Sequence, residues 1–218
     1  VLRANCVRRC CVNFAIIPPF VSVHNAQPFL RPLFIIRVKT MSSNNPRLII
    51  GSSSKYRQEL LSRLHLPFTV VSPNIDETPL AGETPPETAL RLSVEKAHAI
   101  AQQHPDAIII GADQVATVNG IQLGKAGNHA NALKQLQMMR GQTVLFHSAL
   151  CVLDARTGQH QARDVVTKAT LRHLPDEQLS AYLHIEQPYD CAGSAKVEAL
   201  GITLLEKVES DDPTALIG

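Results

Sequence analysis

The sequence predicts an α/β domain whose sheet contains both parallel and antiparallel strands. Short apolar runs alternate along the chain with stretches that have the periodicity of amphipathic helices, which is the pattern of α/β proteins. Some neighbouring runs are separated only by a turn signal, at Asn119-Gly120 and at Thr157-Gly158, and such hairpins join antiparallel strands. We therefore expect a mixed sheet with flanking helices.

The composition fits one ordinary globular domain. The chain has 218 residues, of which 44% are hydrophobic, and its formal net charge is +2. Residues 1–40 contain six bases and no acid, so residues 41–218 carry 15 bases and 19 acids. A mildly acidic body disfavours a nucleic-acid partner, and no apolar run reaches the roughly 18 residues that a membrane span requires.

The first forty residues differ from the rest of the chain. They have no amphipathic period and contain four prolines, and Met41 follows them directly. We interpret 1–40 as a non-native or disordered extension and 41–218 as the functional domain. The alternative is an organellar targeting peptide, because the segment is rich in arginine and free of acids. The five cysteines form no C-x-x-C pair, which favours free thiols in a reducing compartment.

The first half of the domain is predicted to contain three strands and two helices. The strands are expected at 47–50, 68–71 and 107–111, and the helices at 55–64 and 87–103. The residues expected to face the core are Leu60, Leu61 and Leu64 in the first helix, and Leu90, Val94, Ala97 and Ala101 in the second. Residues 72–87 are predicted to form a loop rich in Pro, Thr and acids.

The second half is predicted to alternate hairpins with two further helices. Residues 113–118 continue the third strand and lead into the Asn119-Gly120 turn. The other elements are expected as helices at 128–139 and 175–184 and as strands at 143–154, 162–171 and 200–208. Ala132, Leu133, Leu136 and Met139 should form the core face of the first of these helices.

The stretch GSSSKYRQELL, residues 51–61, is a candidate phosphate site. A strand leads through a serine-rich turn into a helix, whose first N–H groups lack partners and lie at the positive end of the helix dipole. The hydroxyls of Ser52 and Ser54 and the charge of Arg57 would add donors for an anion. The alternative is a serine N-cap with solvated charges, since the stretch has no G-x-x-x-x-G-K-[ST] motif.

Four further residues could complete a nucleotide site. Glu77, next to Asp76 in the predicted loop, could hold a hard cation, and Asp113 follows a buried strand, where α/β sheets bind ligands. Lys96 and Lys125 could bind phosphates. Taken singly, each residue also fits a solvated loop, a turn cap or a surface lysine. No H-E-x-x-H or G-x-S-x-G motif is present.

The order of these motifs resembles the Maf-like nucleotide pyrophosphatases. The resemblance rests on GSSSKYRQELL, NIDETP, RLSVEKA, IIIGADQV, LGK and CAGSAKVEALGI, and it runs from about Pro46 to the C-terminus. It implies cleavage of a nucleoside triphosphate between its α and β phosphates. It also implies a long, bent mixed sheet with two lobes around a cleft, as in inosine-triphosphatase-like proteins. A divalent cation (Mg or Mn), a homodimer and a cytoplasmic location are further implications.

The resemblance also implies roles for individual residues. Asp113 matches the proton acceptor that activates the attacking water. Arg57, Lys96 and Lys125 match cleft positions that neutralise the triphosphate. Glu77, together with Asp113, would hold the metal.

Three positions that separate branches of this family are Tyr56, Gln114 and Glu198. The branch acting on dTTP and UTP has Arg, Thr and Gln there, and the branch acting on 7-methyl-GTP has Trp, Gln and Glu. An aromatic face attracts the cationic 7-methylguanine ring, and a carboxylate accepts hydrogen bonds from guanine. We therefore expect conversion of 7-methyl-GTP to 7-methyl-GMP and pyrophosphate, with dTTP or UTP hydrolysis as the alternative.

The sequence departs from the family pattern at three places. Lys55 and Ala126 stand where relatives usually have proline. The final residues, DDPTALIG, stop where relatives continue with LPL and a last helix. A missing C-terminal helix would reduce stability. A nucleotide-binding pseudoenzyme that has lost turnover is therefore a second alternative.

Overall fold

The computed structural model of the protein describes residues 46–218. The predictions for 1–40 and for Met41 as the start lie outside the described residues. The elements are β1 (Leu48–Gly51), α1 (Lys55–Ser62), β2 (Thr69–Val71), α2 (Pro85–Ala101), β3 (Ile108–Val118), β4 (Ile121–Leu123), α3 (His129–Met139), β5 (Thr143–Asp154), β6 (Gln159–Leu171), α4 (Asp176–Glu186), the 3-10 helix η1 (Leu200–Leu204) and β7 (Leu205–Ser210).

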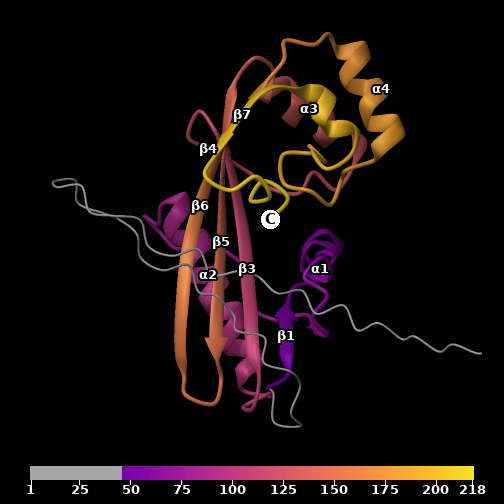
Figure 1. Cartoon of the computed structure of the whole chain (residues 1–218). Coiled ribbons are helices and arrows are strands. Elements are labelled where there is room, and N and C mark those ends of the chain that lie inside the picture. The colour runs from indigo at the N-terminus through magenta and orange to yellow at the C-terminus, as the bar shows by residue number, and fades with distance from the viewer. Residues whose placement is uncertain (1–45) are drawn as a thin grey trace, which may run out of the picture. The chain divides into compact units, whose positions relative to one another are not determined.

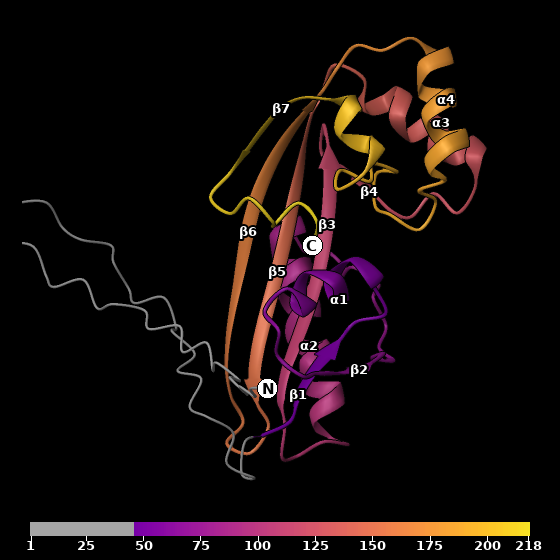
Figure 2. The same cartoon turned by 45° about the vertical axis from the view of Figure 1, so that its right-hand side comes forward.

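The described strands form one mixed sheet, as the sequence predicts (Figure 1). Its order is β2-β1-β3-β5-β6-β7, and β4 pairs with β3. The pairs β1–β2 and β1–β3 are parallel, and the remaining pairs are antiparallel. Figure 2 shows the short strands β1 and β2, with α1, beside the long strand β3. The α/β class and the mixed sheet are confirmed.

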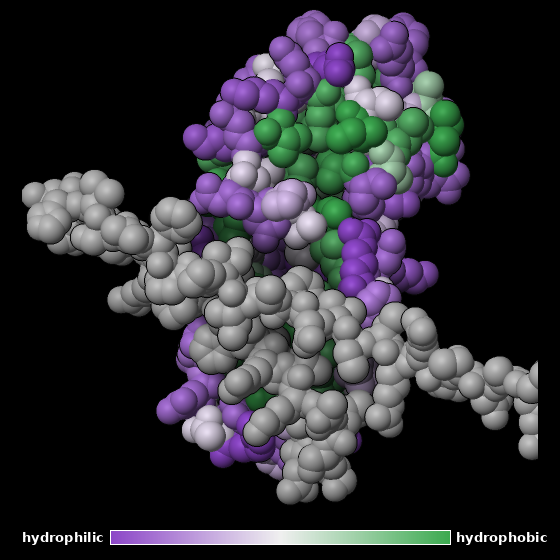
Figure 3. Space-filling model, viewed as in Figure 1, coloured by the Kyte–Doolittle hydropathy of each residue, from purple (hydrophilic) through white to green (hydrophobic). Residues whose placement is uncertain are grey.

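Two large hydrophobic cores and one small cluster lie along the long strands of the described residues. The first lies between α2 and the sheet and includes Ile49, Ile100, Ile109 and Leu153. The second lies between the sheet and α3 and α4, where Leu136 and Leu183 are fully buried. Figure 3 shows apolar residues gathered over the region of α3, α4 and β7. This agrees with the eight partly buried hydrophobic residues that flank the second core. The region around α2 and the region around α3 and α4 are the two lobes of the domain.

Local chemistry explains why several elements form where predicted. The Asn119-Gly120 turn has positive φ at both residues (50° and 77°), which suits a two-residue hairpin and joins β3 to β4. The Asn128 side chain caps α3 by accepting from the N–H of Asn131. At Gly111, β3 approaches α2 so closely that a Cβ atom would lie 2.2 Å from the Ser93 carbonyl oxygen. Because glycine has no Cβ, β3 and α2 can pack closely enough for Lys96 of α2 to reach Asp113 of β3.

The structure corrects the predicted boundaries and core face of the second helix. α2 begins at Pro85, two residues before the predicted start, because Thr84 precedes it as N-cap and proline fits the first helical position. The residues of α2 that are buried are Thr88, Ala89, Leu92, Ser93, Lys96, Ala97 and Ile100. Of the expected face only Ala97 is fully buried, and Leu90, Val94 and Ala101 are half-buried. Apolar periodicity mislocated the face because this helix buries polar side chains.

Two smaller expectations are wrong. Leu64 is 60% exposed, because α1 ends at Ser62 and the chain turns away before reaching it. The predicted strand 200–208 begins instead as the 3-10 helix η1 and becomes β7 only at Leu205. The N–H of Gly201 donates to the Lys196 carbonyl oxygen (2.9 Å), which curls the chain before it can join the sheet. None of the described helices combines the length and the apolarity needed to cross a membrane.

Candidate functional site

One cavity of about 820 Å³ collects all the residues that the sequence singles out. Its lining includes Ser52, Ser54, Tyr56, Arg57, Glu77, Lys96, Asp113, Gln114, Lys125 and Glu198. They come from the β1–α1 turn, the first turn of α1, the β2–α2 loop, α2, β3, the β4–α3 loop and the segment after α4. β1 and β3 are parallel neighbours whose carboxyl ends lie side by side, and β4 folds back along β3. The segment after α4 joins them through a bridge between Ala192 and Lys125.

The serine turn has the geometry of a capped helix N-terminus. Ser54 is the N-cap of α1, and its hydroxyl accepts from the N–H of Arg57 (3.4 Å). Ser52 is buried, and its hydroxyl accepts from the N–H of Ser54 (3.1 Å). The cap is therefore present, and the turn opens into the cavity together with Ser53 and Lys55.

Arg57 is anchored beside Asp113. Its Nη1 donates to the carbonyl oxygen of Ala112 (2.8 Å) and lies 3.5 Å from the Ser52 hydroxyl. Burial lowers the pKa of Arg57, and the carboxylates of Asp113 and Glu77 act in the opposite direction. A guanidinium held between these groups brings a fixed positive charge to the cavity.

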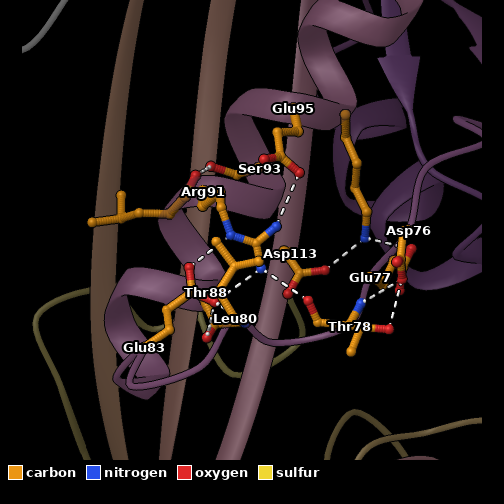
Figure 4. Close-up of polar contacts among 12 residues, drawn as sticks. Asp76, Glu77, Thr78, Leu80, Glu83, Thr88, Arg91, Ser93, Glu95 and Asp113 are labelled. Carbon is orange, nitrogen blue, oxygen red and sulfur yellow. Dashed lines mark hydrogen bonds and ion pairs between the residues drawn. The ribbon is translucent and has the colours of Figure 1, made fainter.

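Lys96 joins two carboxylates at the centre of the site, those of Asp113 and Glu77, which Figure 4 labels. Its Nζ lies 2.6 Å from Oδ1 of Asp113 and 2.8 Å from Oε1 of Glu77. The side chains of Lys96 and Asp113 are only 7% and 10% exposed, whereas that of Glu77 is 56% exposed. Lys96 belongs to α2, Asp113 to β3 and Glu77 to the β2–α2 loop. Three segments therefore meet at one ammonium group.

Tyr56 lies at another part of the cavity, close to Cys191 and Lys196. The Lys196 Nζ is 5.6 Å from the centre of the Tyr56 ring, and the Cys191 thiol donates to its hydroxyl (3.7 Å). Burial, followed by the hydrogen bond with Cys191, raises the pKa of Tyr56, so its hydroxyl is neutral at ordinary pH. Burial is also the main cause that raises the pKa of Glu198.

Gln114 has a defined amide orientation. Its Nε2 donates to the Ser148 hydroxyl (2.9 Å) and to the carbonyl oxygens of Leu216 (3.2 Å) and Ala215 (3.4 Å). Carbonyl oxygens only accept, so the nitrogen of the amide must face them. Lys125 is exposed and is the remaining cation of the predicted set.

Sequence reasoning missed several residues that hold this site in place. Ser148 orients Gln114 across neighbouring strands, and Arg91 with Glu83 supports the loop of Glu77. The Arg91–Glu95 spacing is a local signal, but Glu83 lies eight residues before Arg91, which is no regular helical spacing. Sequence patterns therefore could not reveal these contacts.

Comparison with known proteins yields consistent matches. A protein of Cupriavidus metallidurans named 7-methyl-GTP pyrophosphatase is 66% identical over 177 residues, covering 81% of this chain and 89% of that protein. Proteins of the same name from Ralstonia nicotianae and Thiobacillus denitrificans are 64% identical over 173 residues and 58% over 178. They cover 79% and 82% of this chain, and 89% of each relative.

A solved structure of a HAM1 protein from Coxiella burnetii is a more distant match. It is 16% identical with a TM-score of 0.45, and the match covers 60% of this chain and 75% of that one. The family described as "Maf-like protein" matches residues 47–218, nearly all of the described residues. This chain belongs to the Maf-like protein family.

Proposed function

We propose that this chain hydrolyses 7-methyl-GTP to 7-methyl-GMP and pyrophosphate. The observation that carries this proposal is the cavity, which combines a cationic, serine-lined part with a part that offers an aromatic ring and oxygen acceptors. The three relatives described above are named 7-methyl-GTP pyrophosphatases, which supports the same substrate.

The triphosphate would bind at the start of α1. The free N–H groups of the helix, the hydroxyls of Ser52 and Ser54, and the charges of Arg57 and Lys125 are suitable donors for phosphate oxygens. Catalysis of phosphoryl transfer relies mainly on positioning and on neutralising the charge of the phosphates. The anchored guanidinium of Arg57 is suited to this role because its position does not depend on the substrate.

Asp113 would act as the general base. Its carboxylate would take a proton from a water molecule, whose oxygen attacks the α-phosphorus. The bond from the α-phosphorus to the bridging oxygen breaks, and pyrophosphate leaves with that oxygen. The hydrogen bond from Lys96 holds the Asp113 carboxylate in one orientation, which keeps the base aimed at a single point.

Glu77 and Asp113 are suited to hold a divalent cation, Mg or Mn. Both carboxylates face the same point, since each has an oxygen within 2.8 Å of the Lys96 Nζ. The described residues contain no group of three or more His, Cys, Asp or Glu side chains that could hold a metal. Two carboxylates beside a phosphate pocket fit Mg²⁺, which commonly binds through one or two carboxylates plus substrate phosphates. Such a cation would neutralise charge on the phosphates.

The base would bind beside Tyr56 and Glu198. The ring of Tyr56 can attract the positively charged 7-methylguanine, and the Glu198 carboxylate can accept from the N–H groups of guanine. The Nε2 of Gln114 is already engaged, so this residue offers its Oε1 and also acts as an acceptor. Two acceptors match guanine, which has two neighbouring donors, better than uracil or thymine.

The deciding experiment is pyrophosphate release by the full chain with Mg²⁺ or Mn²⁺. The substrates are 7-methyl-GTP, GTP, dTTP and UTP, and Asp113→Asn is the control. We expect release from 7-methyl-GTP, lowered about 10²–10⁴-fold in the control. Preference for dTTP or UTP would overturn the proposed substrate. Nucleotide binding without any release would favour a pseudoenzyme.

A homodimer and a cytoplasmic location remain predictions of the sequence. Light scattering of the purified chain tests the first, and imaging of the tagged protein in cells tests the second.

A further inference from the structure

The loop between β2 and α2 places Glu77 at the site, and something must hold this loop in position. Glu77 is more than half exposed, and its one ion pair joins it to Lys96. A contact to a carboxylate this open to solvent is screened by water and cannot by itself order a loop. The contacts that do so lie next to it, around Arg91 of α2 (Figure 4).

Arg91 of α2 makes four hydrogen bonds, three to the loop and one to Glu95 of its own helix. Its Nε and Nη2 bind the two carboxylate oxygens of Glu83 at 2.7 and 2.9 Å, the bidentate geometry that makes such pairs strong. Nη2 also donates to the carbonyl oxygen of Thr78 (3.2 Å), and Nη1 donates to Glu95 (3.0 Å). The guanidinium is committed to these partners, which distinguishes it from the cations that line the cavity.

Glu83 extends this connection within the loop. Its Oε2 accepts from the N–H of Leu80 and from the hydroxyl of Thr88, both at 2.9 Å. Its side chain is only 9% exposed. Hydrogen bonds from Arg91 are the main cause that lowers the pKa of Glu83 to about 2, so it stays ionised at neutral pH. The carboxylate thus joins the loop to the first turns of α2.

The residues on either side of Glu77 are both restrained. Thr78 donates from its N–H (2.9 Å) and from its hydroxyl (2.6 Å) to Oδ1 of Asp76, which closes a tight turn around Glu77. The other side of Thr78, its carbonyl oxygen, is held by Arg91. The position of Glu77 is therefore set by a turn that Arg91 ties to α2, the helix that also carries Lys96.

We propose that Arg91, with Glu83, is a positioning residue that fixes the Glu77 carboxylate relative to Lys96 and Asp113. The proposal rests on the proposed function, in which Glu77 takes part in catalysis. Arg91 acts through Glu77 and contacts no substrate. Losing such a support typically lowers activity about 10–100-fold, because small misplacements of a reacting group are costly.

A double-mutant cycle in the full chain tests this coupling. The variants are Arg91→Met, Glu77→Gln and the two together, and kcat and KM for 7-methyl-GTP are measured for each. Arg91→Met alone should lower kcat about 10–100-fold, with a smaller change in KM. In the Glu77→Gln background the same substitution should lower kcat less than about twofold, because the group that it positions is already disabled.

Arg156→Met is the matched control. Arg156 forms a comparable bidentate pair with Asp154 (2.8 and 2.6 Å), but at the β5–β6 turn, outside the cavity. It should leave kcat unchanged in both backgrounds. Hydrogen exchange provides a readout independent of activity: the amides of Thr78 and Leu80 should exchange faster in Arg91→Met and not in Arg156→Met. Should Arg91→Met fail to fold, Glu83→Gln replaces it, since it keeps the shape of the side chain.

The outcomes separate this proposal from the proposed function. An equal loss of kcat on adding Arg91→Met to either background, or a fall in melting temperature with kcat intact, would overturn the positioning role alone. If Glu77→Gln itself leaves kcat unchanged, Glu77 takes no part in the reaction. The role proposed for Glu77 and the positioning role of Arg91 then both fail, whereas pyrophosphate release from 7-methyl-GTP is tested separately.

Discussion

The two lobes of the domain bury very different helix faces. In the lobe of α3 and α4, the buried helix residues are Ala132, Leu136, Met139, Leu179, Tyr182 and Leu183, and Tyr182 is the only one of these six with a polar side-chain atom. In the other lobe, α2 buries Thr88, Ser93 and Lys96 beside its apolar residues. Burying a charge is costly unless it is paired. Of these three helices, α2 is the one that lines the cavity.

This difference separates a scaffold from a working surface. The apolar faces of α3 and α4 hold one end of the sheet together, so that β4 and the segment after α4 can bring Lys125 and Glu198 to the cavity. The polar face of α2 contributes directly to the site, through Lys96, and supports it, through Arg91. Substitutions in the lobe of α3 and α4 should therefore change mainly stability, and substitutions in the lobe of α2 should also change turnover.

The largest expected effect is the loss of unfolding free energy in Leu136→Ala. Leu136 is fully buried in the lobe of α3 and α4, and such truncations cost about 2–5 kcal/mol of unfolding free energy. kcat should stay within about threefold at a temperature where the variant is folded, since Leu136 does not line the cavity. Urea unfolding and pyrophosphate release measure the two. Leu64→Ala, the same change at a 60% exposed position, should leave stability almost unaltered. A large loss of kcat in Leu136→Ala would contradict the separation.

Gly111→Ala changes the lobe of α2, at the contact between β3 and α2. The new Cβ would lie 2.2 Å from the Ser93 carbonyl oxygen and 2.8 Å from the Ala97 nitrogen, so helix and strand must move apart. We expect a loss of about 1–3 kcal/mol in stability. A clear loss of kcat should accompany it, because Lys96 and Asp113 lie on the two separated elements. Gly124→Ala, with no atom within 4 Å of its Cβ, is the control for stability. Unchanged kcat in Gly111→Ala would show that the spacing tolerates movement.

Tyr56→Leu tests the base-binding part of the cavity. Removing the aromatic ring should lower kcat/KM for 7-methyl-GTP about 2–30-fold, the range of a cation–π contact. The loss should be smaller for GTP, whose base carries no charge. Tyr56→Phe keeps the ring and should retain the preference for 7-methyl-GTP. Equal losses for both nucleotides in Tyr56→Leu would mean that the ring does not recognise charge.

The smallest effect is the pH dependence of the Glu83 contacts. Folding lowers the pKa of Glu83 from its ordinary value of 4.5 to about 2, chiefly through the hydrogen bonds from Arg91. Its contribution to stability is therefore fully present above about pH 4.5 and is lost as the pH falls toward about 2. The melting temperature of the wild type should exceed that of Glu83→Gln at neutral pH, and the gap should narrow in acid. A gap in melting temperature that widens in acid would contradict a lowered pKa of Glu83 in the folded protein.

Predictions from the sequence succeeded where the signal is local. The strand at 143–154, the helix ending at Met139 and the hairpin at Asn119-Gly120 all agree with the structure, because periodicity, caps and turn residues act over a few residues. The core face of α2 was mislocated because Lys96 is buried through ion pairs, which apolar periodicity does not register. The 3-10 helix η1 depends on the close approach of Gly201 to Lys196, a packing contact without a sequence signature.

The sequence by itself determined the order of the main elements and ten of the polar residues that line the cavity. Residue types at strand ends and helix starts are read from short segments, and their chemistry is independent of what packs around them. Only the tertiary structure decided which of these side chains meet. Lys96 reaches Asp113 and Glu77, Ser148 orients Gln114, and Arg91 holds the loop through Thr78. These contacts join separate elements, so they exist only once the sheet and α2 have packed together.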